Sequence, residues 1–180
     1  MSNILYIFGW NSSPESDTLK TLQELLPEHN VTSIAYNQND PEEAINFFNT
    51  YIPNNNINLV IASSYGAFIA SQIKHSIFKI LINPCLQPST EIPKLASIPN
   101  KFLESCIYLE SLKKVDDEER HFTHAFFSTN DELFSHKNIY KSLGYHHLTD
   151  LPSEKHKLSR ASLQKVSDQI NISQNLWYNL

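Results

Sequence analysis

Asn58-Leu59-Val60-Ile61-Ala62-Ser63-Ser64-Tyr65-Gly66-Ala67-Phe68-Ile69-Ala70-Ser71-Gln72-Ile73 is the stretch of sequence that decides the fold. Its first part is a short apolar run rich in β-branched residues, which is typical of a buried strand. After Gly66, the apolar residues Phe68, Ile69 and Ile73 recur at helical spacing. The pattern therefore predicts a strand that turns directly into a helix.

Between the strand and the helix, residues 62–66 have the pattern small-x-Ser-x-Gly. A sharp strand-to-helix turn needs small residues around its tip, because the helix and the neighbouring backbone approach closely there. The tip residue is held in a strained conformation that lifts its side chain above the edge of the sheet. This makes Ser64 a candidate nucleophile. The alternative interpretation, a serine that only caps the helix, stays open on this pattern alone.

The composition favours one ordinary globular domain spanning residues 1–180, since 41% of the residues are hydrophobic and 18% are charged. The formal net charge is −5 and the basic residues are scattered, so neither nucleic acid nor a membrane is expected as a partner. The first residues form a strand-like run and lack the basic region that opens a signal peptide. Together with only two cysteines, Cys85 and Cys106, this predicts a cytoplasmic protein with reduced thiols.

Strand-like and helix-like segments alternate along the chain. This alternation predicts an α/β fold with a single-domain, doubly wound, mostly parallel six-stranded sheet and helices on both faces. The proline-rich stretch 84–99 is expected to be a loop, and residues 84–121 to form a small cover over the site. The acidic run 116–119 is expected to be a solvated surface stretch. Strands are expected at 3–8, 31–36, 57–62, 78–83, 123–128 and 145–149, and helices at 16–26, 41–51, from 64 onward, 101–112, 136–143 and 157–170.

In the simplest strand order for such a sheet, 2-1-3-4-5-6, the order reverses between strands one and three. Ligands bind at that point, at the carboxyl ends of the strands. Those two strands end at residues 8–10 and 62–64. The fold and the serine turn therefore indicate the same site.

A serine nucleophile needs a base and an acid that orients it, and in this architecture both follow the serine in the chain. Asp131, after the fifth strand, is the candidate acid, with Glu132 as the alternative. His156, just beyond the sixth strand, is the candidate base. His146 and His147 are expected inside that strand, and the other histidines to be structural or on the surface.

A tetrahedral intermediate also needs two N–H donors for its negative oxygen. One is expected from the backbone of Tyr65, directly after the nucleophile, and the other from the backbone of Trp10 after the first strand. The chain has only three glycines. Gly9 and Gly66 mark these two turns, and Gly144 is expected to end a helix.

With these residues in place, the chain resembles the small bacterial YqiA-type esterases of the α/β-hydrolase superfamily. The resemblance rests on Phe8-Gly9-Trp10-Asn11-Ser12-Ser13-Pro14, Ala62-Ser63-Ser64-Tyr65-Gly66-Ala67, Asn83-Pro84, Asn130-Asp131-Glu132 and His156. It implies hydrolysis of carboxylic esters or thioesters through an acyl-enzyme, with no metal and no cofactor. The implied partner is a small-molecule acyl ester or acyl thioester, with an acyl-carrier protein as a further candidate.

Two alternatives follow from the first of these motifs. Phe8-Gly9-Trp10 is similar to the corresponding motif of esterases that demethylate pimeloyl-carrier-protein esters in biotin synthesis. Phe8 also replaces a histidine that usually helps to hold the oxyanion loop, which motivates a catalytically silent binding module. A flavodoxin-like nucleotide binder would share the strand order, but the chain lacks a Gly-rich phosphate loop.

Overall fold

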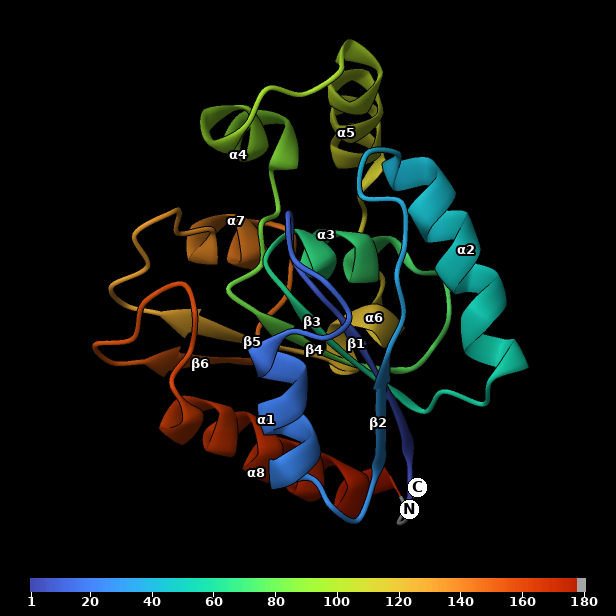
Figure 1. Ribbon diagram of the computed structural model, residues 1–180, viewed down its shortest axis with the longest axis vertical. Coiled ribbons are helices and arrows are strands. Elements are labelled where there is room, and N and C mark those ends of the chain that lie inside the picture. The colour runs from blue at the N-terminus through green and yellow to red at the C-terminus, as the bar shows by residue number, and fades with distance from the viewer. Residues whose placement is uncertain (178–180) are drawn as a thin grey trace.

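The computed structural model describes the backbone of residues 1–177 and the side chains of residues 1–170. One sheet of six parallel strands runs through the molecule in the order β2-β1-β3-β4-β5-β6, which confirms the expected order (Figure 1). The central strands β1, β3 and β4 are almost wholly apolar because helices cover both faces of the sheet. The six strands are β1 (Asn3–Ile7), β2 (Asn30–Ser33), β3 (Leu59–Ser63), β4 (Phe78–Ile82), β5 (Thr123–Ser128) and β6 (Leu148–Leu151).

The helices divide the apolar residues into two cores. Leucines of α1 (Asp17–Leu25) and apolar residues of α8 (Arg160–Trp177) pack on one face of the sheet, where these two helices lie side by side (Figure 1). The other face packs against α2 (Pro41–Asn54), α3 (Tyr65–Gln72) and α7 (Lys137–Ser142). Each core is a continuous layer, so the central strands contribute side chains to both.

Local sequence signals explain where two of these helices begin. The Ser16 side chain accepts a hydrogen bond from Leu19 N and caps α1. Asp40 caps α2 in the same way through Glu43 N, and Pro41 occupies the first helical position, where its missing N–H costs nothing. Both helices therefore start where the sequence predicts.

The proline-rich stretch 84–99 is not all loop, as was expected, because it contains helix α4 (Pro88–Leu95). Pro88 stands in the first turn, where a helix tolerates proline, and Pro93 removes only one hydrogen bond from a two-turn helix. Helix α5 (Asn100–Leu112) follows. In Figure 1 both helices stand beyond one edge of the sheet, in the segment expected to cover the site.

Two further boundaries differ from the expected ones. Strand β6 begins at Leu148, so His146 and His147 lie before the strand and not inside it. Helix α8 begins at Arg160 and continues to Trp177, so most of the expected polar tail is helical; residues 178–180 lie outside the described residues. No helix in the described part of the chain has the length and apolar character to cross a membrane.

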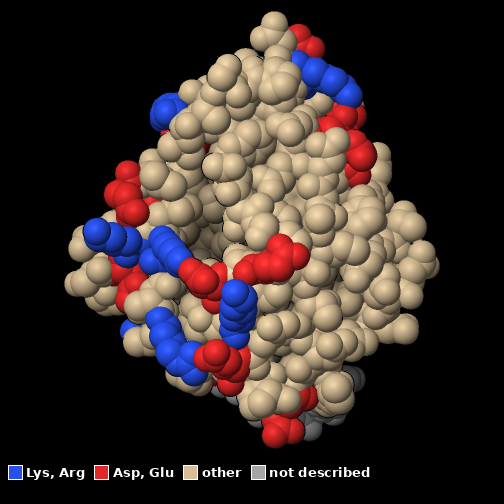
Figure 2. Space-filling view, in the orientation of Figure 1, with Lys and Arg blue, Asp and Glu red and all other residues tan. Residues whose placement is uncertain are grey.

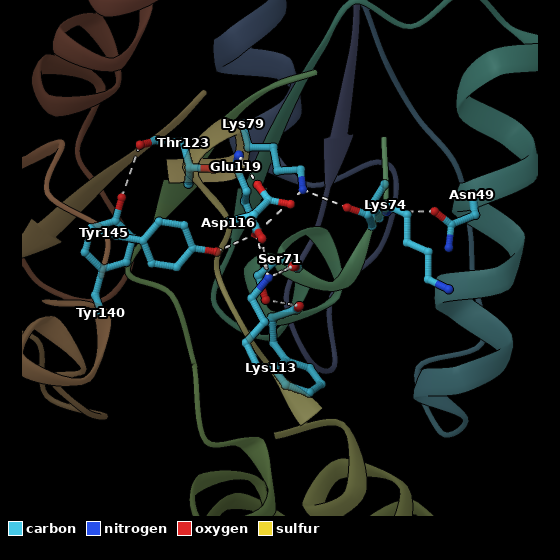
Figure 3. A network of polar contacts seen from close by, with 12 residues as sticks. Asn49, Ser71, Lys74, Lys79, Lys113, Asp116, Glu119, Thr123, Tyr140 and Tyr145 are labelled. Carbon is cyan, nitrogen blue, oxygen red and sulfur yellow. Dashed lines mark hydrogen bonds and ion pairs between the residues drawn. The ribbon is translucent and has the colours of Figure 1, made fainter. Parts of the chain in front are cut away.

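The expectation of a solvated acidic run at 116–119 is wrong for its last residue. Helix α6 (Asp117–His121) turns Glu119 inward, where its carboxylate accepts hydrogen bonds from Lys113 at 2.6 and 2.7 Å and from Tyr145 at 2.5 Å. Lys79 Nζ lies 3.9 Å away. Figure 3 shows these side chains converging at the amino ends of β4 and β5, and we call Lys79, Lys113, Glu119 and Tyr145 the ion cluster.

Candidate active site

Ser64 forms the tip of the turn between β3 and α3. Its backbone has φ 54° and ψ −123°, a strained conformation, and α3 starts at the next residue. The turn is tight because α3 begins against the end of β1. A Cβ on Gly66 would lie 2.4 Å from the carbonyl oxygens of both Ile7 and Phe8, so only glycine fits there.

The loop after β1 passes directly over the serine. A Cβ on Gly9 would lie 2.9 Å from Ser64 Cβ and 3.5 Å from Ser64 Oγ. Both glycines that the sequence assigned to the site are therefore required by close approach of the backbone. Gly144, with φ 97°, follows the end of α7 as expected.

Asp131 and His156 meet although they belong to different loops. Asp131 Oδ2 lies 2.8 Å from His156 Nδ1. The other oxygen, Oδ1, accepts the backbone N–H groups of Leu133 and Phe134 at 2.9 and 3.2 Å. The Asp131 side chain is 3% exposed and that of His156 is 16% exposed. A carboxylate only accepts hydrogen bonds, so Nδ1 carries the proton in this pair and Nε2 is left as the basic nitrogen.

Glu132 holds the backbone of the histidine loop and not its ring. Its Oε2 accepts the backbone N–H of His156 at 2.9 Å, and this bond lowers the pKa of the Glu132 carboxyl. The Phe134 ring meets the His156 ring edge to face, with centroids 4.8 Å apart. The structure therefore brings Asp131 to the imidazole and leaves Glu132 and Phe134 to orient it.

A cavity of about 430 Å³ connects the serine with the histidine. Ser64 and His156 both line it, together with Gly9, Trp10 and apolar side chains such as Leu133. Within the described residues, the Ser64 hydroxyl and His156 Nε2 have no hydrogen-bond partner. Figure 2 shows a hollow on the molecular face, with charged side chains gathered along its lower rim and few above it.

The backbone N–H groups of Trp10 and Tyr65 also lack hydrogen-bond acceptors within the described residues. Tyr65 is the first residue of α3, where an N–H has no partner inside the helix. The loop that carries Trp10 is held by its neighbours, because the Tyr36 hydroxyl donates to Phe8 O at 2.7 Å and Gln38 Oε1 accepts Asn11 N–H at 2.6 Å. These bonds fix the loop without a histidine at position 8.

Sequence reasoning missed three residues that shape this site. Tyr6 donates to or accepts from Ser63 Oγ at 2.8 Å beside the nucleophile, and burial raises the pKa of its hydroxyl. Phe134 packs against the histidine, and Gln38 clamps the loop after β1. The sequence around Tyr6 indicates only a buried strand residue, and no local pattern indicates a role for Phe134 or Gln38.

The remaining histidines do not join the site. The His136 ring is buried and accepts Leu86 N–H at 2.8 Å. Burial lowers the pKa of His124 to about 4, helped by the neighbouring His147. Among the residues whose placement is described, no group of three metal-binding side chains occurs. Both cysteines are buried and unpaired.

Comparison with protein families gives one match. The model of an uncharacterised protein family, UPF0227, matches residues 3–171, which agrees with the resemblance found in the sequence. No curated protein matches the chain significantly.

Solved structures of low sequence identity share the fold. Est1E from Butyrivibrio proteoclasticus, solved with ferulic acid, superposes with a TM-score of 0.68 at 11% identity, covering 98% of this chain and 90% of that one. A thioesterase from the prodiginine pathway of Streptomyces coelicolor gives 0.57 at 11% identity, covering 91% and 88%. The esterase domain of a Rhodothermus marinus protein gives 0.59 at 13% identity, covering 94% and 84%. These likenesses confirm the expected α/β-hydrolase fold.

Proposed function

Because the chain belongs to the UPF0227 family and has an α/β-hydrolase fold, we propose that it is a serine hydrolase of carboxylic esters or thioesters. The observation that carries the proposal is the 2.8 Å contact between Asp131 and His156 at a cavity that Ser64 also lines. In a catalytic triad, the aspartate orients and polarises the imidazole. The second nitrogen of the imidazole then takes the proton of the serine hydroxyl.

In the proposed reaction, Ser64 Oγ attacks the carbonyl carbon of the ester and its proton moves to His156 Nε2. The electron pair of the carbonyl bond moves to oxygen, which accepts hydrogen bonds from Trp10 N–H and Tyr65 N–H. The intermediate then expels the alcohol or thiol, which takes the proton from Nε2 and leaves an acyl group on Ser64. Water, deprotonated by the same nitrogen, releases the acid and restores the serine.

Apolar side chains around the cavity, including Ile82, Leu133 and Leu158, support an acyl group as the bound portion of the substrate. Leu95 of α4 also lines the cavity, which supports the proposal that residues 84–121 cover the site. The unpaired buried thiols suit the cytoplasm as the working compartment.

A second candidate function is ligand binding without turnover. It agrees with one observation: within the described residues, Ser64 makes no hydrogen bond to His156. Catalytic hydrogen bonds are often long before substrate binds, so this geometry agrees with either function.

Labelling with a fluorophosphonate distinguishes the two candidates. A hydrolase is expected to form a covalent adduct on Ser64, located by peptide mass spectrometry, and the Ser64→Ala variant is expected to form none. The adjacent Ser63 is the internal control, because the same peptide reports both positions. An unlabelled Ser64 in folded protein would contradict the hydrolase proposal and favour the silent binding module.

A further inference from the structure

A second hollow adjoins the proposed active site and has a different chemistry. It is an open groove of about 910 Å³ between the loop after β1 and the loop after β2, and Leu95 at the end of α4 also lines it. We call it the polar groove, and its lining is formed by residues 10–13, 16, 36–39, 95 and 96. Seven of these residues are Asn, Gln or Ser, and none is Lys, Arg, His, Asp or Glu.

Several polar side chains in the groove are free to bind a ligand. Among the side chains that the structure describes, those of Asn11, Ser12 and Asn39 form no hydrogen bond. An amide offers a donor and an acceptor side by side, and a serine hydroxyl offers both on one atom. A ligand that matches this lining presents neighbouring groups that each donate and accept, as the hydroxyl groups of a polyol do.

The walls of the groove are fixed before any ligand binds. Gln38 joins the two loops, because its Oε1 accepts from Asn11 N at 2.6 Å and its Nε2 donates to Ser12 O at 2.9 Å. Tyr65 OH donates to Gln38 O at 3.2 Å and ties the same loop to α3. The Trp10 ring packs against Phe102, with centroids 4.9 Å apart. A fixed groove loses little conformational entropy on binding.

The charges near the groove disfavour a leaving group that carries phosphate. Phosphates are bound by Arg and Lys side chains, and the groove has neither. The one lysine that lines the neighbouring cavity, Lys157, donates to Asp17 at 2.9 Å, and Asp17 and Glu15 also line that cavity. Coenzyme A or a phosphopantetheine arm would therefore meet no unpaired cation here.

The groove and the proposed catalytic cavity lie next to each other. Trp10, Ser12, Ser16 and Leu95 line both. An ester positioned at Ser64 has an acyl part and an alcohol part. The cavity offers Ile82, Leu133 and Leu158 beside its polar and charged residues, whereas most of the groove lining is amide or hydroxyl. The two parts of the ester therefore match the two hollows.

We propose that the polar groove binds the alcohol portion of the substrate, and that this alcohol is uncharged and polyhydroxylated, such as a sugar. This inference rests on the proposed hydrolase function. Amides and hydroxyls along the groove bind the hydroxyl groups, and the rings of Trp10 and Tyr36 face the carbon skeleton. The protein thus acts on acylated sugars in preference to simple or phosphate-bearing esters.

Three butyryl compounds test the proposal: 6-O-butyrylglucose, methyl butyrate and butyryl-coenzyme A. We expect kcat/KM for the glucose ester to exceed that for methyl butyrate by about tenfold or more, with the coenzyme A ester lowest. The Asn39→Ala and Ser12→Ala variants are each expected to lower the ratio of glucose-ester to methyl-ester kcat/KM by about fivefold, the value of one hydrogen bond. Asn54→Ala, an exposed asparagine outside the groove, is the matched control and should leave the ratio unchanged.

Binding without turnover gives an independent readout. The chain has two tryptophans, Trp10 and Trp177, and a Trp177→Phe variant identifies the ¹⁵N-indole signal of Trp10. Glucose titrated to about 100 mM should shift that signal, and Asn39→Ala should weaken the binding about fivefold. Equal turnover of the glucose and methyl esters with no indole shift, or a preference for butyryl-coenzyme A, would overturn the groove proposal and leave the hydrolase intact. An indole shift without hydrolysis of any ester would support the groove and contradict the hydrolase.

Discussion

Two groups of polar residues lie at opposite ends of the strands of the same sheet. The cavity lined by Ser64 and His156, about 430 Å³, lies at the carboxyl ends of the strands, whereas the ion cluster lies at the amino ends of β4 and β5 beside a cavity of about 90 Å³. In the ion cluster, Glu119 is bonded on both oxygens and Lys79 donates to Ile73 O at 2.8 Å. In the cavity, Ser64 Oγ and His156 Nε2 have no partner within the described residues.

The difference separates polar groups that stabilise from polar groups that are available for chemistry. A buried charge is stable only if other groups of the protein bind it, and the charged groups of the ion cluster all have such partners. Beside the cluster, the uncharged Thr123 Oγ1 is buried without a hydrogen-bond partner. Groups in the cavity keep their bonding capacity for a substrate. Substitutions should therefore affect activity at the carboxyl ends of the strands, in the cavity, and stability at the amino ends, in the ion cluster.

The largest effect is expected for Ser64→Ala, which removes the proposed nucleophile. We expect kcat for ester hydrolysis to fall by about 10⁶-fold while the melting temperature stays the same or rises, because alanine loses no partner there. Steady-state kinetics and thermal denaturation measure both quantities. Ser111→Ala, at an exposed position of α5, serves as the control, and a Ser64→Ala enzyme of normal activity would place the reaction elsewhere.

Asp131→Asn should lower kcat by about 10⁴-fold, because an amide can favour the wrong imidazole tautomer. Glu132→Gln is the matched control. A glutamine oxygen can still accept the His156 backbone N–H, so we expect less than a tenfold loss. A larger loss for Glu132→Gln than for Asp131→Asn would reverse the assignment of the acid.

At the amino ends of the strands, Glu119→Gln should lower the free energy of unfolding by about 3 kcal/mol, because it removes the carboxylate that pairs with the buried Lys79 and Lys113. Urea denaturation measures this value, and kcat should stay within about twofold of the wild type. Glu118→Gln, one residue away and exposed, controls for the loss of charge. If Glu119→Gln reduced kcat instead of stability, the two regions would not be independent.

The smallest effect concerns pH. Burial lowers the pKa of Lys79 to about 8, while the unfolded chain keeps this proton to about pH 10.5. Between these values the unfolded state holds the Lys79 proton and the folded state does not, so the contribution of Lys79 to stability rises with pH. We expect this contribution to rise by about 2 kcal/mol from pH 8 to pH 10. Burial raises the pKa of the Cys85 and Cys106 thiols and of Tyr145, and their contributions fall over the same range because these groups ionise first in the unfolded chain.

The Lys79→Met variant tests the origin of that rise. It keeps the length of the side chain and removes the titrating amine, whereas the thiols and tyrosines titrate equally in both proteins. The stability of the wild type relative to the variant should therefore rise by about 2 kcal/mol between pH 8 and pH 10. Lys113 still neutralises Glu119 in this variant. The same pH dependence in wild type and variant would assign the effect to another group.

Much of the fold followed from local patterns. The alternation of apolar strands with amphipathic helices predicted the sheet and its order, since each pattern reports the face that one segment buries. The proline-rich stretch was misread because a proline in a first helical turn looks, in sequence, like a proline in a loop. Glu119 was misread because an acidic run does not reveal which of its carboxylates turns inward.

By itself, the sequence determined the α/β fold, the serine turn, the two glycines that pack closely at it and the loops that carry Asp131 and His156. Each of these depends on spacing within a few residues, or on an approach so close that only glycine fits. Only the tertiary structure decided that Asp131, and not Glu132, meets the imidazole, and that Gln38 fixes the loop after β1. The reason is that such contacts join segments about 25 residues apart in the chain, and their distances depend on how the whole sheet and its loops pack.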